Sequence, residues 1–445
     1  MNEWSIKNAT VVSGKGRFEA NLYIKDGIIY DILPLGKSKI AANTLDLKGD
    51  LLFPGLIDDQ VHFREPGLTH KGNIWSESRA AIAGGITSFM EMPNTNPPVL
   101  TQELLAQKYE IAAQTSAANY SFFMGCSADN YQEVMKTDLQ NVCGLKIFLG
   151  SSTGNLLMDD SEVLEKIFGT FEGLIAVHAE DDSYIAQRLA EAKAEYGENI
   201  PPYFHPIIRD EEACFRSSSK AVALAERTGA RLHVLHISTA KELSLFKNDI
   251  PLSQKKITAE ACVHHLWFCD EDYERLGNFI KWNPAVKKKS DREAIRAAVL
   301  DGRIDVLATD HAPHTLQEKQ NSYGKAPSGG PLVQHALPAL LELAQQGVFA
   351  EELIALKYAE NVAELFQIDR RGRVEEGFFA DLVHVQNQSF RVEKSNLLYH
   401  CGWSPFEGCV FSKKVAHSWV NGELGWDGKN ILEHQSSKRL QFNRK

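Results

Sequence analysis

Short apolar runs alternate with amphipathic stretches through the middle of the chain. Eight such runs read as strands, the first being GLIDDQV (55–61) and the last DVLATD (305–310). Segments between them, such as SESRAAIAGG (76–85) and REAIRAAVLDG (292–302), have the spacing of helices. Strands that alternate with helices predict βαβ units and a parallel sheet. Eight units favour an α/β fold closed as a (β/α)8 TIM-type barrel over an open sheet.

The two ends of the chain have a different pattern, in which apolar and polar residues alternate with turns between them. Lys25-Asp26-Gly27 predicts a tight hairpin near the start, and GFFADLVHV and KVAHSWVNGEL read as strands near the end. We therefore expect residues 1–53 and 368–445 to form one small β-sandwich domain, with residues 54–367 as the barrel. Two separate β-ribbons packed on the middle are the alternative.

Composition narrows the range of partners and compartments. The 48 Lys and Arg residues against 58 Asp and Glu give a net charge of −10 without a long basic run, so no nucleic-acid partner is expected. Seven cysteines are scattered without a CxxC pair, which is typical of reduced thiols and gives no structural zinc site. Neither a secretory signal nor an apolar stretch of membrane-spanning length is visible, so we expect a cytoplasmic protein without membrane contact.

Reactive side chains gather where the predicted strands end. In a (β/α)8 barrel the active site lies at the carboxyl ends of the strands. Several histidines, an apolar-flanked lysine and an aspartate at the ends of different strands would be an unlikely arrangement in a purely structural barrel. The polar residues at these ends are Gln60, His62, Asn94, Lys146, His178, His236, His264, Asp310 and His314.

Three of these residues have chemistry that depends on their setting. Gln60 and His62 lie two apart on a strand and so point to the same face, as a pair of metal ligands would. The Gln60 amide oxygen is a weak zinc ligand, and a single histidine such as His62 is more often a core residue. Lys146 in GLKIFLG is flanked by apolar residues, and a buried ammonium is costly. It either reaches out of the barrel mouth or reacts with CO2 to give an anionic carbamate that can bridge two metals.

Several motifs together carry a family resemblance over nearly the whole length. They are PGLIDDQVHFREPG, MPNTNP, VHAED, HIST, TAEACVHH, NPA and ATDHAPH. With these motifs the chain resembles the amidohydrolase superfamily, and within it the type I dihydroorotases. The REPG and MPNTNP segments favour dihydroorotases over allantoinases and hydantoinases, because the guanidinium of Arg64 would bind a ring carboxylate that only a dihydroorotase substrate carries. A salt bridge within the protein is the other reading of Arg64.

The resemblance implies a metal centre with one or two Zn²⁺ ions per chain. His62, Lys146 carrying a CO2-derived carbamate, and Asp310 would hold the first ion. Lys146, His178 and His236 would hold the second.

The resemblance also implies a small-molecule substrate and a reaction. Arg64, Asn94 and His314 would bind the substrate carboxylate, and Asn283 would position the ring. Asp310 would act as general base and then as general acid. The expected reaction is the reversible hydrolysis of (S)-dihydroorotate to N-carbamoyl-L-aspartate in de novo pyrimidine biosynthesis. The family is commonly homodimeric, and the segment from His314 to Pro331 could act as a mobile lid.

Gln60 departs from the family pattern, which has histidine at that position. One tightly bound zinc ion, two ions with the first bound weakly, or an inactive scaffold for aspartate transcarbamoylase are the three outcomes. We favour retained activity, since the other site residues are all present. A dihydropyrimidinase, hydantoinase or allantoinase is the alternative within the enzymes.

Overall fold

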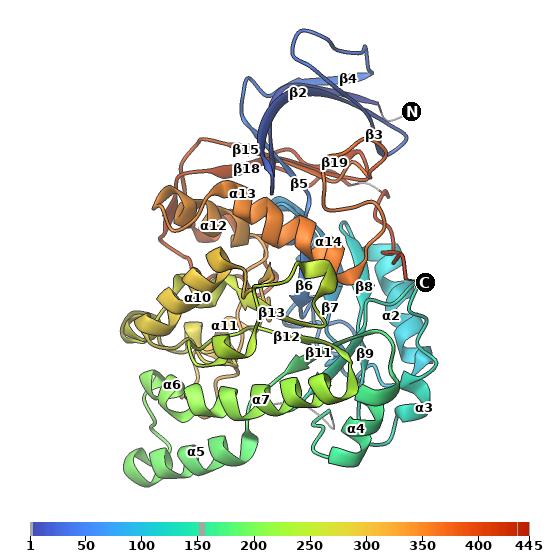
Figure 1. The fold of residues 1–445 in the computed structure, drawn as a ribbon. Helices are drawn as coiled ribbons and strands as arrows, with labels where there is room; N and C mark the ends of the chain where they lie inside the picture. Colours follow the sequence, from blue (N-terminus) through green and yellow to red (C-terminus); the bar gives the residue numbers. More distant parts are fainter. Residues whose placement is uncertain (1–2, 151–155, 434, 445) are drawn as a thin grey trace.

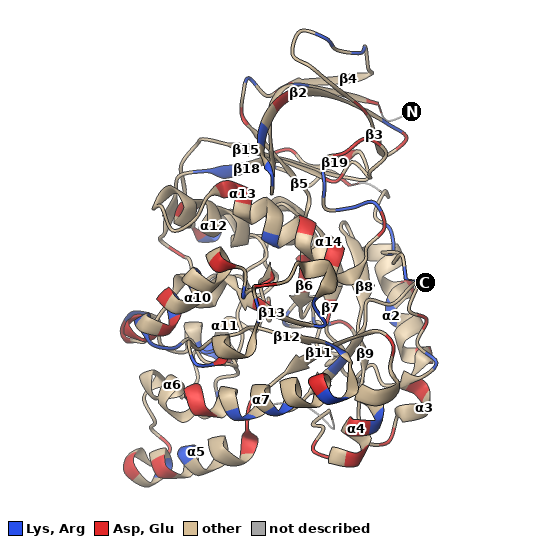
Figure 2. Ribbon diagram, in the orientation of Figure 1, with Lys and Arg blue, Asp and Glu red and all other residues tan. Residues whose placement is uncertain are grey.

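The computed structural model describes residues 3–150, 156–433 and 435–444. Figure 1 shows a β-rich part at one end of the molecule and a larger part in which helices surround short parallel strands. Among the described residues, no helix combines the length and apolar character needed to cross a membrane. Both signs of charge occur along α5, α7 and α10 in Figure 2.

Strands from both ends of the chain form one sheet with the order β19-β18-β15-β5-β1-β2-β3, and β4 pairs with β1. The two ends meet where β5 and β15 pair antiparallel, with Leu382 opposite Pro54. The ends therefore do not form two separate ribbons, whereas the domain boundaries stay a prediction. The strands are β1 (Trp4–Ser13), β2 (Gly16–Lys25), β3 (Ile28–Leu33), β4 (Asn43–Asp46), β5 (Leu51–Pro54), β15 (Leu382–Gln386), β18 (Lys414–Val420) and β19 (Glu423–Trp426).

The predicted hairpin between the second and third of these strands is confirmed. Asp26 and Gly27 have φ values of 52° and 80°, so both central residues of the turn are left-handed. A two-residue turn of this kind matches the twist of the strands it joins, and glycine takes the second position without strain.

The parallel strands of the larger part coincide with the predicted apolar runs. A three-stranded sheet has the order β6-β7-β8, and a six-stranded sheet has the order β14-β13-β12-β11-β10-β9. A parallel bridge between Val61 and His311 joins the end of β6 to the chain just after β14. The parallel α/β architecture is confirmed, and closure into one complete barrel stays a prediction. The strands are β6 (Leu56–Val61), β7 (Ile86–Glu91), β8 (Asn119–Phe122), β9 (Met124–Gly125), β10 (Leu145–Phe148), β11 (Leu174–His178), β12 (Arg231–Val234), β13 (Ile257–Cys262) and β14 (Val306–Ala308).

Helices follow most of these strands, and the two predicted from spacing fall on α1 and α10. Side chains at the helix starts satisfy exposed amides: Asp210, for example, accepts from the N–H groups of Glu212 and Ala213. The longer helices are α1 (Ile74–Ala83), α2 (Gln102–Thr115), α4 (Ser161–Thr170), α5 (Asp182–Tyr196), α7 (Glu211–Thr228), α10 (Lys289–Asp301) and α12 (Ala336–Gln345). The shorter ones are α3 (Tyr131–Val134), α6 (His205–Ile208), α8 (Val263–Trp267), α9 (Tyr273–Leu276), α11 (Leu316–Lys319), α13 (Glu351–Ala355) and α14 (Asn361–Phe366).

An apolar cluster binds the strands to the last of these helices. Val362 and Phe366 of α14 belong to the same buried cluster as Ile57, Met90 and Ala176, which lie on β6, β7 and β11. Side chains that alternate along parallel strands thus fill the interior with apolar groups. The polar residues predicted for the site stand near the carboxyl ends of these strands.

Candidate active site

One cavity of about 240 Å³ collects every site residue expected from the sequence. Its wall also includes two aromatic rings, Phe148 and Trp282, and the segment Pro327 to Gly329. His264, another strand-end residue, does not line the cavity and instead stacks on Trp282 with ring centroids 4.5 Å apart. The expected residues in the wall are Gln60, His62, Arg64, Asn94, Lys146, His178, His236, Asn283, Asp310 and His314. Their proximity is a property of the fold, while their individual roles stay predictions.

Lys146 on β10 is almost fully buried, with 1% of its surface exposed. Its Nζ atom lies 4.6 Å from the centroid of the Phe148 ring. Burial lowers the pKa of Lys146 to about 7, although Asp310 and Glu260 oppose the shift. Since only an unprotonated amine reacts with CO2, an amine with this pKa is chemically suited to carry a carbamate at neutral pH.

His178 and His236 point ring nitrogens at each other, with Nδ1 of the first 3.0 Å from Nε2 of the second. The other nitrogen of His178, Nε2, lies 3.0 Å from the carboxylate of Glu180. Burial alone would raise the pKa of Glu180, but Arg209 and His178 bring it down to about 2, so an ionised carboxylate lies beside His178 Nε2. The ring of His178 therefore lies between this carboxylate and His236, with Nδ1 on the His236 side.

Such a histidine pair, with a carboxylate behind one ring, is a typical donor set for a metal ion. Burial lowers the pKa of His236 well below its usual value, which keeps the ring neutral and able to ligate. Together with Lys146, these two residues fit a bound zinc ion. The metal and the carbamate themselves stay predictions.

The other predicted ligands converge on one oxygen of Asp310. His62 Nε2 lies 3.1 Å from Asp310 Oδ1, and the Gln60 amide nitrogen donates to the same oxygen at 3.3 Å. His62 Nδ1 lies 2.7 Å from Asn94 Oδ1. Burial raises the pKa of Asp310 to about 7, so this carboxyl can exchange a proton near neutral pH.

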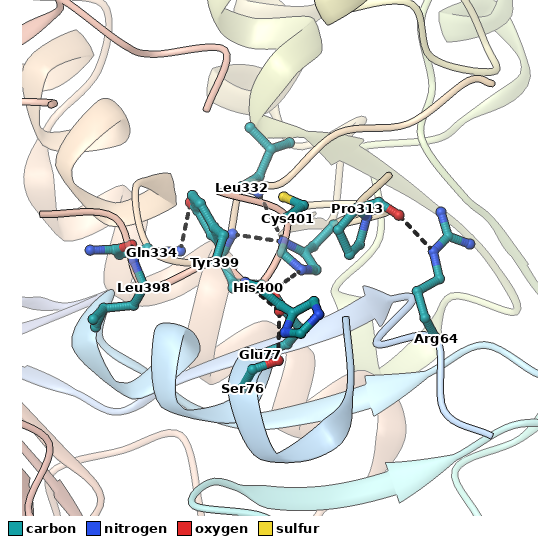
Figure 3. A network of polar contacts seen from close by, with 12 residues as sticks. Arg64, Ser76, Glu77, Pro313, Leu332, Gln334, Leu398, Tyr399, His400 and Cys401 are labelled. Atoms are coloured by element: carbon teal, nitrogen blue, oxygen red, sulfur yellow. Dashed lines mark hydrogen bonds and ion pairs between the residues drawn. The ribbon is translucent and has the colours of Figure 1, made fainter. Parts of the chain in front are cut away.

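Arg64 is buried at the edge of the cavity and is held through its backbone and side chain. Its N–H donates to Glu91 Oε1 at 3.1 Å, and Glu91 pairs with the buried ammonium of Lys108 at 3.0 Å. Its Nε donates to the carbonyl oxygen of Pro313 at 3.0 Å, as Figure 3 shows. Its Nη2 lies 3.0 Å from His314 Nε2. Burial lowers the pKa of Arg64 to about 10, which leaves it charged at neutral pH.

Three site residues have left-handed backbones: Arg64 (φ 72°), His236 (φ 41°) and Asp310 (φ 50°). Non-glycine residues rarely adopt this conformation, and it persists where surrounding contacts hold it. The N–H of His236 donates to Glu260 Oε1 at 2.9 Å, which is one such contact.

A second contact fixes the chain beyond Asp310. His311 Nε2 lies 2.9 Å from Glu77 on α1, and Glu77 also accepts from the N–H of His400 at 3.0 Å and from Ser76 Oγ at 2.9 Å. Figure 3 shows this network beside Arg64. In the sequence, the Asp310-His311 pair in ATDHAPH is the one signal for this network, and it does not reveal the partners of His311.

The segment predicted as a lid is anchored by the buried side chain of Lys319. Lys319 Nζ donates to the carbonyl oxygens of Gly329 at 2.8 Å, Pro327 at 2.9 Å and Lys281 at 3.3 Å. Gly329 has a φ of 127°, and a Cβ there would lie 2.5 Å from the carbonyl oxygen of Ala312, so glycine is required. Lys319 thus contacts two of the three wall residues 327–329, and His314 Nε2 lies 3.0 Å from the carbonyl oxygen of the third, Ser328.

A second buried polar group, also missed from the sequence, is formed by Asp59, His233 and Glu260. His233 Nε2 lies 3.2 Å from Asp59 Oδ2 and 3.9 Å from Glu260 Oε2. Burial would lower the pKa of His233, but the hydrogen bond to Asp59 and the nearby carboxylate of Glu260 raise it to about 9. The ligand atoms of the three residues lie within 4.8 Å of one another, so in the described part of the chain this group could also hold a metal ion. None of the three lines the cavity.

Comparisons with known proteins agree with the fold. The amidohydrolase family model matches residues 51–425. A dihydroorotase of Halobacterium salinarum is 33% identical over 421 residues, covering 92% of this chain and 96% of the relative. An allantoinase of Bacillus velezensis is 31% identical over 427 residues, covering 94% and 92%. The solved structure of an L-hydantoinase (dihydropyrimidinase) from Arthrobacter aurescens superimposes with a TM-score of 0.92 at 25% identity, covering 99% of this chain and all of that one.

The fold, the cavity and the relatives define an enzyme that hydrolyses cyclic amides. More particularly, the chain belongs to the amidohydrolase family. Dihydroorotases, allantoinases and hydantoinases all occur among its relatives, so the family alone leaves the ring that it opens undecided.

Proposed function

We propose that this enzyme is a dihydroorotase, which interconverts (S)-dihydroorotate and N-carbamoyl-L-aspartate in pyrimidine biosynthesis. The observation that carries the proposal is the buried guanidinium of Arg64 in the cavity wall beside His314, with Asn94 in the same wall. A cationic fork in a cavity of this size suits a small ring that bears a carboxylate. Several of the curated relatives at about 30% identity are named dihydroorotase, which supports the same substrate.

The donor set of the cavity suits zinc held by Lys146, His178 and His236, with His62 and Asp310 beside it. When bound, the metal would polarise the ring carbonyl and make a water molecule more acidic. The facing ring nitrogens of His178 and His236, the lowered pKa of His236 and the low pKa of Lys146 are the features of this chain that favour loading.

The remaining side chains would position the ring and move the proton. Arg64 would clamp the carboxylate, and Asn94, whose Oδ1 is engaged by His62, would offer its amide hydrogens to the same group. Asn283 Oδ1 is buried without a hydrogen-bond partner among the described residues, which makes it an acceptor for a ring N–H. Asp310 would take a proton from the attacking water and return it to the leaving nitrogen.

The test is a panel of cyclic amides given to zinc-loaded protein. Dihydroorotate should be hydrolysed with a kcat/KM at least about 100-fold above that for dihydrouracil, hydantoin or allantoin. Carbamoyl-aspartate should be cyclised by the same preparation. A preference for an uncharged ring would replace the proposal with a dihydropyrimidinase or allantoinase activity. Inactivity on every ring would favour the alternative of an inactive scaffold that binds aspartate transcarbamoylase.

A further inference from the structure

The amide of Gln60 is oriented by its neighbours, and its orientation affects the metal centre. Gln60 Nε2 donates to Asp310 Oδ1 at 3.3 Å, and Gln60 Oε1 faces the thiol of Cys262 at 3.6 Å. Reversing the amide would set its oxygen against the Asp310 carboxylate, two acceptors without a hydrogen between them. The amide nitrogen therefore faces Asp310, and the oxygen that could ligate a metal is turned away.

A second layer of contacts holds the thiol on that side. Cys262 Sγ lies 3.2 Å from Glu260 Oε1, and the same carboxylate oxygen accepts the backbone N–H of His236 at 2.9 Å. All of these groups are fully buried or nearly so. The orientation of Gln60 is thus tied, through Cys262 and Glu260, to the strand end that carries a predicted metal ligand.

The two predicted ligand sets differ in what they offer a cation. In the set around Lys146, two imidazole nitrogens face each other, with His178 Nδ1 3.0 Å from His236 Nε2. In the set around Asp310, the only histidine is His62, and Asp310 Oδ1 already receives the Gln60 amide. A neutral amide oxygen is a poor zinc ligand, and here it is also turned aside.

We infer that this enzyme holds a single zinc ion, at Lys146, His178 and His236. In place of a second ion, the Gln60 amide contacts the Asp310 carboxyl by donating a hydrogen bond to it. Gln60 is then a positioning residue, because it orients the carboxyl that moves the proton. The inference deepens the proposed function and rests on it for the reaction, but its metal count can be measured without any substrate.

The decisive experiment counts zinc in matched variants. Protein is stripped with a chelator, reloaded with ZnCl2 in bicarbonate buffer, desalted, and analysed for zinc and protein. Wild type should hold about one zinc ion per chain. H178N should lose it, whereas H62N should keep it, since His62 belongs to the set that lacks a metal. In a two-metal centre, H62N and H178N would each lose about one of two ions, and that result would overturn the inference.

Restoring the missing ligand gives the reciprocal test. Q60H should raise the zinc content to about two ions per chain, and reloading it with Mn²⁺ should give an electron paramagnetic resonance spectrum with exchange coupling that wild type lacks. Q60M is the matched control, because methionine has similar length but neither donor nor strong ligand, and Q60M should stay at about one ion.

Two ions in wild type would refute the inference even if dihydroorotate is the substrate. One ion with no dihydroorotate turnover would leave the inference standing and refute the proposed substrate. Circular dichroism melts identify any variant that fails to fold, and the H62N and H178N comparison does not depend on Q60H.

Discussion

Replacing Arg64 with methionine tests the substrate proposal most directly. The Nε–H of Arg64 is engaged by Pro313 and part of Nη2 faces His314, which leaves at least two N–H groups for a bound carboxylate. A hydrogen bond to a charged partner contributes about 1.5–3 kcal/mol, so losing two costs about 3–6 kcal/mol. At about 1.4 kcal/mol per decade, kcat/KM for dihydroorotate should fall by about 10²- to 10⁴-fold in R64M.

The assay compares a carboxylated and an uncharged ring on the same protein. Initial rates for dihydroorotate and dihydrouracil are measured for wild type and R64M, and competitive inhibition by orotate and uracil gives the same comparison without turnover. In R64M, kcat/KM for dihydrouracil and the inhibition constant of uracil should change less than about 10-fold, because these uncharged rings make no charged contact with Arg64. R64K is the matched control, since it keeps the charge without the planar fork. Its kcat/KM for dihydroorotate should lie between those of wild type and R64M. Equal losses on both kinds of ring would show that Arg64 supports the fold of the cavity and does not read the carboxylate.

Three further variants test the other roles. D310N should reduce kcat by about 10³-fold or more while its melting temperature stays near that of wild type; near-normal kcat would remove Asp310 from proton transfer. K146M should retain no zinc after reloading, and the carbamate signal that wild type gives in ¹³C nuclear magnetic resonance after treatment with labelled bicarbonate should be absent; a persisting signal would place the carbamate elsewhere. K319M removes the donor from three buried carbonyl groups and should destabilise the protein by at least about 2 kcal/mol in urea and raise KM for dihydroorotate more than it lowers kcat. An unchanged KM would show that the wall at residues 327–329 does not depend on Lys319.

Much of the fold could be predicted because strands and helices leave distinct periodicities. Each apolar run expected to be a strand contains one, from β6 to β14, and the hairpin at Asp26-Gly27 follows from turn chemistry. The pairing of β5 with β15 was one of two possibilities, because an alternating pattern shows which face of a strand is buried but not which strand lies beside it.

The site could be anticipated for a related reason. Parallel strands bring their carboxyl ends to one edge, so residues far apart in sequence, such as His62 and Asp310, can be assigned to one cavity before any distance is known. The residues behind that cavity left no such signal. Glu77 and Lys108 lie on helices with ordinary spacing, and their buried partners His311 and Glu91 become apparent only in three dimensions.

Glu260 shows most clearly where reasoning from sequence ends. In TAEAC it is one polar residue in a short strand, a pattern that predicts only an interruption in an apolar run. In the structure one of its oxygens accepts from His236 and Cys262, while the other faces His233. A buried carboxylate is costly unless it is paired. Glu260 has partners on both sides: His233, which also contacts Asp59, and Cys262, which also contacts Gln60. Gln60, which stands where the family has histidine, therefore belongs to a connected set of buried polar groups. The effect of Gln60 on metal binding follows from the direction in which these groups turn its amide, and not from the residue type alone.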